Sequence, residues 1–182
     1  MTFTRGYKKD EGSVGSAKNA ADKTIPVKAL PVKAISVKAI SVKDRALGLL
    51  ARREHSAAEL KRKLQQKGYA SADIDAGLSP LLLDGSVSDQ RFTEAYVNMR
   101  MNRGYGPMRI LAELRERGIP AELAHEYLNQ ETLDWYTVLN RQYIKKYAGA
   151  PVTDHQDKSK RIAYLQARGF RLDLIFDVIN PS

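Results

Sequence analysis

One short motif occurs three times in this 182-residue chain at almost equal intervals. It has the form Leu-x-x-(Lys/Arg)-Gly-apolar, and successive motif glycines are separated by 50 and then 51 residues. The copies are Leu64-Gln65-Gln66-Lys67-Gly68-Tyr69, Leu114-Arg115-Glu116-Arg117-Gly118-Ile119 and Leu165-Gln166-Ala167-Arg168-Gly169-Phe170. A fixed period of this size is typical of repeat architectures. The sequence therefore predicts a fold built from three similar units.

The motif has a direct physical interpretation as the end of a helix. A basic residue in the last turn interacts favourably with the negative end of the helix dipole. Glycine just beyond the helix adopts the left-handed conformation that other residues avoid, and the apolar residue after it folds back on the helix. We therefore expect one helix to end shortly before each of Gly68, Gly118 and Gly169.

Hydrophobic spacing predicts nine helices in three sets of three. The repeats are expected at about residues 44–87, 88–131 and 132–182, after a tail of residues 1–43. In the first repeat we expect a helix over residues 44–54, a second from the capping box that begins at Ser56, and a third near Ser71. Pro80 should kink or split that third helix, because proline lacks an N–H and crowds the preceding turn.

Start and stop signals continue through the other two repeats. Asp89 is expected to cap the first helix of repeat two, and Pro107 to take a first helical position after the break at residues 104–106. Pro120 should start the third helix of that repeat. A capping box is expected at Thr153 in repeat three. No alternating strand pattern follows the tail, so the expected fold class is all-α.

The first part of the chain differs in composition from the rest. Residues 1–44 contain nine Lys/Arg and four Asp/Glu, a net charge of +5. This segment therefore carries over half of the formal net charge of +9 of the whole chain. Residues 27–41 repeat the pattern Val-Lys-Ala-(Leu/Ile)-(Pro/Ser), and a five-residue period keeps no helix or strand face apolar. We expect a disordered, basic, low-complexity tail. It is interpreted either as a linker or as a basic arm that grips nucleic acid or an acidic partner.

Several classes of site lack their characteristic residues. The chain has no cysteine, which excludes disulfides, thiol catalysis and cysteine-based zinc sites, and its three histidines are isolated in the sequence. No Gly-x-x-x-x-Gly-Lys-Ser/Thr loop is present, and the glycine pair around Tyr105 does not follow a strand. We therefore expect a protein that is not an enzyme, has no catalytic residues and holds no metal or cofactor.

The location of the protein is also an expectation from composition. No window approaches the 18 or more apolar residues of a membrane span, and the N-terminus has no apolar signal segment. The absence of cysteine fits a reducing compartment. We expect a cytoplasmic protein without membrane contact.

Basic residues concentrate on the first two helices of repeats one and two. Arg53 and Arg103 each lie 15 residues before a motif glycine, just before the turn into the second helix. Tyr105 is either a packing anchor or an exposed aromatic contact. The candidate partner-binding residues are Arg52, Arg53, Lys61, Lys67, Arg91, Arg100, Arg103, Tyr105 and Arg109. The alternative for each cation is a solvated polar face, since long charged side chains also cover apolar surface.

These residues resemble the RecX family, whose members regulate the RecA recombinase. Residues 50–60, followed by Lys63 and Leu64, are similar to the family's first block. Its central block is matched by Asp89-Gln90-Arg91-Phe92, Arg100, Arg103-Gly104-Tyr105-Gly106-Pro107, Ile110, Glu113-Leu114 and Arg117-Gly118-Ile119. The last repeat is similar more loosely, through Tyr164-Leu165 and Arg168-Gly169-Phe170. The resemblance covers about residues 44–180 and does not extend to the tail.

The resemblance implies an elongated, curved all-α array of three-helix repeats. It implies a regulator that binds the groove of the RecA–DNA filament and limits filament growth, ATP hydrolysis and strand exchange in DNA repair, homologous recombination and the SOS response. The expected partners are the RecA filament and, weakly, single- and double-stranded DNA, with the protein itself a monomer. Two alternatives are a helical nucleic-acid-binding module that acts without RecA and a passive interaction scaffold.

Overall fold

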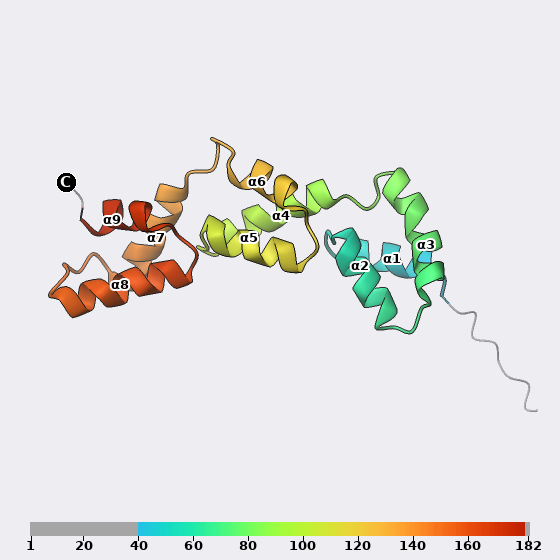
Figure 1. Ribbon diagram of the computed structural model, residues 1–182, viewed down its shortest axis with the longest axis horizontal. Helices are drawn as coiled ribbons and strands as arrows, with labels where there is room; N and C mark the ends of the chain where they lie inside the picture. The colour runs from blue at the N-terminus through green and yellow to red at the C-terminus, as the bar shows by residue number, and fades with distance from the viewer. Residues whose placement is uncertain (1–39, 181–182) are drawn as a thin grey trace, which may run out of the picture. The chain divides into compact units, whose positions relative to one another are not determined.

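The computed structural model describes residues 40–180, and this part of the chain folds into nine α-helices without a strand (Figure 1). The helices are α1 (Val42–Leu50), α2 (Ala57–Gln65), α3 (Ser71–Leu83), α4 (Asp89–Asn102), α5 (Pro107–Glu116), α6 (Ala121–Leu128), α7 (Trp135–Tyr147), α8 (His155–Ala167) and α9 (Leu172–Ile179). The all-α prediction with three three-helix repeats is confirmed. Most of the predicted tail, residues 1–39, lies outside the described residues, as do residues 181–182.

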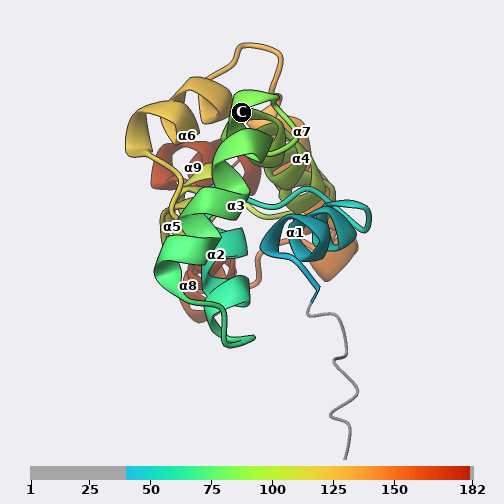
Figure 2. The same ribbon diagram turned by 90° about the vertical axis from the view of Figure 1, so that its right-hand side faces the viewer.

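Each set of three helices has its own hydrophobic core. In every set the third helix packs against the first and the second, so that α3 contacts α1 and α2, α6 contacts α4 and α5, and α9 contacts α7 and α8. Figure 2 shows α1, α2 and α3 together in the foreground. The motif leucines, Leu64, Leu114 and Leu165, are fully buried, one in each core. The repeated motif therefore supplies one central core residue to each set.

The three motif copies end helices as the sequence predicts. Gly68, Gly118 and Gly169 have φ angles of +87°, +77° and +92°. In each copy the N–H of the apolar residue after the glycine donates to the carbonyl of the motif leucine, at 3.3, 3.1 and 3.3 Å respectively. This bond satisfies a carbonyl that the helix end would otherwise leave open.

α1 is displaced toward the N-terminus relative to the prediction over residues 44–54. The Ser41 hydroxyl accepts a hydrogen bond from the Asp44 N–H at 3.1 Å, so the helix begins at the residue after Ser41. It ends at Leu50, because the chain tightens there into a turn in which the Arg52 N–H donates to the carbonyl of Leu49, three residues earlier. The turn of residues 51–55 carries two of the candidate arginines.

Two predicted N-caps are wrong by one residue. Ser88, not Asp89, caps α4, and its hydroxyl accepts a hydrogen bond from the Arg91 N–H at 3.2 Å. Asp154, not Thr153, caps α8, and its carboxylate accepts a hydrogen bond of 2.8 Å from the Asp157 N–H. In both cases two adjacent side chains are able to accept a capping bond. Asp89 is already the first residue of α4 and Asp154 directly precedes α8, so the N-cap positions belong to Ser88 and Asp154.

Pro80 lies inside α3 without splitting it. The helix is continuous from Ser71 to Leu83. A proline at position 80 removes the hydrogen bond that the Ala76 carbonyl would accept. Both Ala76 and Pro80 are exposed, so water can satisfy that carbonyl. The expected division of this helix is wrong for that reason.

Consecutive repeats are joined end to end through their second helices, α2, α5 and α8 (Figure 1). The Arg117 carbonyl at the end of α5 accepts a hydrogen bond of 2.7 Å from the Ser56 hydroxyl at the start of α2. The Arg168 carbonyl at the end of α8 accepts one of 2.8 Å from the Gly106 N–H at the start of α5. Each junction places the positive N-terminal end of one helix against the negative C-terminal end of the next, which is favourable for both helix dipoles.

Candidate partner-binding surface

The nine candidate residues are distributed over repeats one and two rather than gathered in one pocket. Arg52 and Arg53 lie in the turn before α2, Lys61 on α2, Lys67 just after it, Arg91 and Arg100 on α4, Arg103 and Tyr105 in the turn before α5, and Arg109 on α5. Their side chains form two groups. Three make no polar contact within the described part of the chain, and six are held by intramolecular contacts.

Arg52, Lys67 and Arg103 form the first group. All three residues are exposed. Among residues 40–180 their side chains take part in no ion pair and no hydrogen bond. Each lies at a turn or just beyond a helix end, where a long side chain extends outward. These three cations are therefore the best placed of the nine to bind a partner.

Arg53 is held in a two-pronged ion pair with Glu59. Its Nη1 and Nη2 atoms donate to the two carboxylate oxygens at 3.0 and 2.7 Å. Nδ1 of the buried His55 lies 2.9 Å from the same carboxylate. The Ser56 hydroxyl accepts from the Glu59 N–H at 3.0 Å, so the predicted capping bond of α2 is confirmed. Arg53 thus stabilises the turn into α2 rather than extending freely into solvent.

The neighbours of Glu59 change its acidity. Burial by itself would raise the pKa of this carboxyl, but hydrogen bonds from Arg53 and His55, together with their charges, lower the pKa to about 2. Burial of the imidazole lowers the pKa of His55. Glu59 therefore remains ionised, and paired with Arg53, into strongly acidic solution.

Replacing Glu59 with glutamine is expected to remove part of the acid sensitivity of the fold. The ordinary pKa of 4.5 applies to the unfolded chain, whereas the folded value is about 2. The stability that ionised Glu59 contributes is present above pH 4.5 and is lost as the pH falls from there toward 2. We expect Glu59→Gln to be less stable at neutral pH and to lose less stability than the wild type over that acid interval. Thermal midpoints measured across it test this, and parallel curves would contradict it.

Lys61 and Arg91 form exposed ion pairs. Lys61 Nζ lies 2.7 Å from a carboxylate oxygen of Asp75 on α3, and Arg91 Nε lies 2.9 Å from Glu54 in the turn before α2. Both cations are about half exposed. Such surface pairs contribute little to stability, because water competes for both groups. Lys61 and Arg91 therefore remain accessible to an external acidic group.

Tyr105 is surrounded by arginines from two repeats. The guanidinium carbons of Arg100, Arg109 and Arg168 lie 3.8, 4.7 and 5.2 Å from the centroid of its ring. Arg100 and Arg109 both donate to the carboxylate of Glu113. The side chain of Arg100 is only 12% exposed. The structure thus gives Tyr105 an internal packing role and makes Arg100 mainly an internal residue.

Arg168 and Glu113 complete this cluster and were not among the sequence candidates. The Arg168 guanidinium donates to the carbonyls of Arg103 and Gly104, each at 3.2 Å, and so connects repeat three to repeat two. The motif itself contains Arg168, so its basic character is visible in the sequence. Its position beside Tyr105 depends on contacts between residues more than 60 positions apart, which the motif does not indicate.

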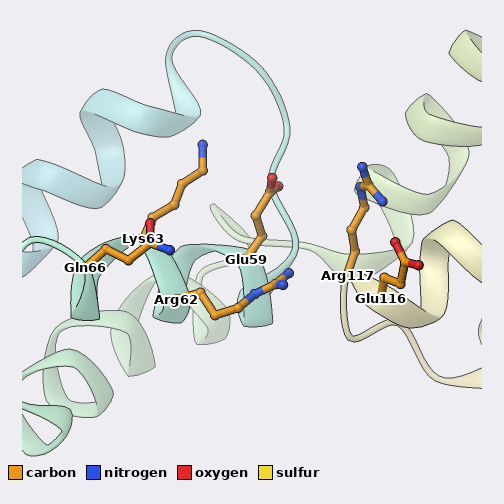
Figure 3. Close-up of a pocket in the computed structure, with 6 residues that line it drawn as sticks. All are labelled: Glu59, Arg62, Lys63, Gln66, Glu116 and Arg117. Atoms are coloured by element: carbon orange, nitrogen blue, oxygen red, sulfur yellow. The ribbon is translucent and has the colours of Figure 1, made fainter.

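A cleft of about 300 Å³ lies between α2 and the end of α5 (Figure 3). It is lined by Glu59, Arg62, Lys63, Gln66, Glu116 and Arg117. Three cations and two carboxylates share this small space, so their charges nearly balance. Residues 40–180 contain no cluster of three potential metal ligands. Over the same range no helix is long and apolar enough to cross a bilayer.

Comparison with known families matches each three-helix set separately. Residues 43–78 match the first three-helix domain of RecX, residues 88–128 the second and residues 134–179 the third. Together the matches span about two thirds of the chain. The chain belongs to the RecX family. The three RecX domains occur in the order in which the sequence repeats occur, so the resemblance inferred from the sequence is confirmed.

Individual RecX proteins agree with this assignment. Regulatory protein RecX of Pseudomonas savastanoi pv. phaseolicola is 39% identical over 130 residues, 71% of this chain and 84% of the relative. Regulatory protein RecX of Legionella pneumophila is 38% identical over 137 residues, 75% of this chain and 91% of the relative. The crystal structure of RecX from Lactobacillus salivarius has a TM-score of 0.62 at 21% identity, over 76% of this chain and 92% of that one. This structural likeness supports the fold, and the relatives are named regulatory proteins.

Proposed function

We propose that this RecX-family chain is a modulator, mainly an inhibitor, of the RecA recombinase. It binds in the groove of the RecA–DNA filament and limits filament growth, ATP hydrolysis and strand exchange in DNA repair and recombination. The observation that carries the proposal is the match of all three helix sets to successive RecX domains. Relatives that cover more than 70% of the chain are named regulatory proteins, which supports a regulatory rather than an enzymatic role.

The surface chemistry supports a binding role. Arg52, Lys67 and Arg103 expose cations that have no polar partner within residues 40–180, and Lys61 and Arg91 are half-exposed cations in surface ion pairs. A nucleoprotein filament presents phosphates and acidic side chains, which attract such cations. In this proposal the protein acts in the cytoplasm as a monomer, without a metal, a cofactor or a membrane.

Titration of the full chain into RecA that is hydrolysing ATP on single-stranded DNA tests the proposal. A filament modulator should reduce hydrolysis at amounts too small to saturate the DNA. The alternative, a helical nucleic-acid-binding module that acts without RecA, is favoured only by the basic surface. That module should bind naked DNA with a steep salt dependence and should reduce hydrolysis only near saturation. Undiminished hydrolysis at every concentration would refute the proposed function.

Deletion of residues 1–40 is expected to weaken naked-DNA binding while leaving inhibition of RecA nearly unchanged. The deletion removes eight basic residues and retains Lys43. Each phosphate that the tail no longer neutralises should flatten the log–log salt dependence on single strands by about 0.7. The measurement is DNA binding at several salt concentrations, with RecA-dependent ATP hydrolysis in parallel. Loss of inhibition by a folded truncated protein would locate the functional determinant in the tail instead.

A further inference from the structure

The three helix stops have the same backbone shape but different surroundings. A Cβ atom added to Gly118 would lie 2.4 Å from the Ala58 side chain, and one added to Gly169 would lie 2.4 Å from the backbone nitrogen of Arg109. A Cβ atom added to Gly68 would have nothing within 4 Å. The helix ends at Gly118 and Gly169 are therefore closely packed against another part of the chain, whereas the helix end at Gly68 in repeat one has open space beside it.

The covering group is the same at both closed stops. In each case it is the N-terminal end of the second helix of the preceding repeat, which donates a hydrogen bond to the carbonyl before the glycine. Ser56 Oγ donates to Arg117 at 2.7 Å, and the Gly106 N–H donates to Arg168 at 2.8 Å. The corresponding carbonyl in repeat one belongs to Lys67, and no group of residues 40–180 donates to it.

The apolar residue after each glycine shows the same difference. Ile119 and Phe170 are each 3% exposed, whereas Tyr69 is only half-buried. The Tyr69 hydroxyl donates to the Ile40 carbonyl at 2.7 Å, which fixes the ring beside the start of α1. Lys67, Gly68 and Tyr69, which we call the α2 end, therefore have the shape of a helix-docking surface without its counterpart.

We propose that the α2 end receives the N-terminal end of a helix of a RecA subunit. The C-terminal end of α5 receives the start of α2 in this way, and the C-terminal end of α8 receives the start of α5. The inference rests on the proposed function and names the surface that performs it. The two internal junctions indicate the chemistry of the partner helix. It has a hydroxyl residue or glycine at its N-cap, as Ser56 and Gly106 are at those places, and a first turn that packs directly on the motif glycine.

Charge supports the same orientation. The positive end of a partner helix dipole would meet the open carbonyls of the α2 end. Acidic side chains are favoured in the first turn of a helix, and the exposed cation of Lys67 is placed to pair with one.

A second copy of this chain fits the α2 end less well. The equivalent unpaired N-terminal end within the described residues is that of α8, which Asp154 caps. An ionised carboxylate has no hydrogen to donate to a carbonyl, unlike the Ser56 hydroxyl, and its negative oxygens would face the open carbonyls of the α2 end. The Asp154 carboxylate already accepts the Asp157 N–H at 2.8 Å. The partner is therefore assigned to the filament.

The test compares Gly68→Asn with Gly149→Asn in the full chain. Both glycines have left-handed φ angles, +87° and +73°, and both have open space where a side chain would go. Asparagine tolerates this conformation, so both variants should unfold at nearly the wild-type temperature. The Gly68→Asn side chain would occupy the place of the partner helix. We expect it to raise the concentration for half-inhibition of RecA-dependent ATP hydrolysis about tenfold, the effect of one missing interface hydrogen bond, and Gly149→Asn to leave it unchanged.

The outcomes separate this inference from the proposed function. Absence of inhibition by the wild type would refute the function, whereas full inhibition by both the wild type and Gly68→Asn would refute only the docking surface. Lys67→Glu leaves the glycine in place and should also weaken inhibition of RecA. This second variant replaces Gly68→Asn in the test if Gly68→Asn proves unstable. Sedimentation velocity gives the third outcome. Self-association of the wild type that Gly68→Asn abolishes would assign the α2 end to a second copy and overturn the proposal.

Discussion

Replacing Gly169 with alanine is expected to lower the free energy of unfolding by about 3 kcal/mol, because a strained backbone and an overpacked junction both contribute. The φ angle of Gly169 is +92°, a conformation that costs about 1–2 kcal/mol for a residue with a side chain. The added Cβ atom would also lie 2.4 Å from the Arg109 backbone nitrogen. That nitrogen belongs to α5, so relief of the clash would have to separate repeats two and three.

Gly68→Ala is the matched control for this effect. Gly68 has a φ angle of +87° but open space around it, so only the conformational cost of about 1 kcal/mol is expected there. Chemical denaturation of the wild type and both variants gives the comparison. Equal losses of stability at the two glycines would mean that the tight approach at Gly169 contributes nothing to the junction between repeats.

The double substitution Arg52→Glu and Arg103→Glu is expected to raise the concentration for half-inhibition of RecA by about 100-fold. Both side chains are exposed and make no polar contact with residues 40–180, so their reversal should leave the fold intact. Like charges brought together in an interface cost several kcal/mol, and each 1.4 kcal/mol corresponds to about tenfold in affinity. The measurement is RecA-dependent ATP hydrolysis with the variant titrated in.

Arg141→Glu provides the control for that charge reversal. Arg141 is an exposed arginine on α7, outside the candidate set, and within residues 40–180 its side chain forms no ion pair. The control changes net charge in the same direction but is expected to have little effect on inhibition. Wild-type inhibition by the folded double variant would exclude Arg52 and Arg103 as partner contacts.

Part of the candidate surface was predictable from sequence positions, and part was not. Arg53 and Arg103 occupy equivalent places before their stop glycines, which the spacing shows directly. Their side chains nevertheless differ, because nine residues before the glycine repeat one has Glu59 and repeat two has Arg109. Glu59 captures Arg53 at 2.7 Å, while Arg103 has no carboxylate at the corresponding place. Only the folded turn shows that these positions face each other.

The helix boundaries show where local chemistry suffices. The stop at each motif glycine, the capping bond of Ser56 and the start of α5 at Pro107 all follow from groups within a few residues of one another. Local rules cannot choose between adjacent capping residues such as Ser88 and Asp89, because both side chains accept the same bond. They also overstate the effect of Pro80, because the cost of an unpaired carbonyl depends on whether water reaches it.

The amino-acid sequence by itself determined the three-repeat all-α fold, the position of each helix stop and the membership of the RecX family. The fold and the helix stops follow from short-range hydrogen bonding, conformational preference and hydrophobic period, which act within a few residues, whereas the family follows from the resemblance of the sequence blocks. The tertiary structure alone decided which polar groups are already occupied. Asp89 accepts the Ala57 N–H from 32 residues away, and Ser56 donates to Arg117 across 61 residues. Pairing over such distances depends on how neighbouring repeats dock, so only the fold distinguishes the internal arginines from those that remain exposed.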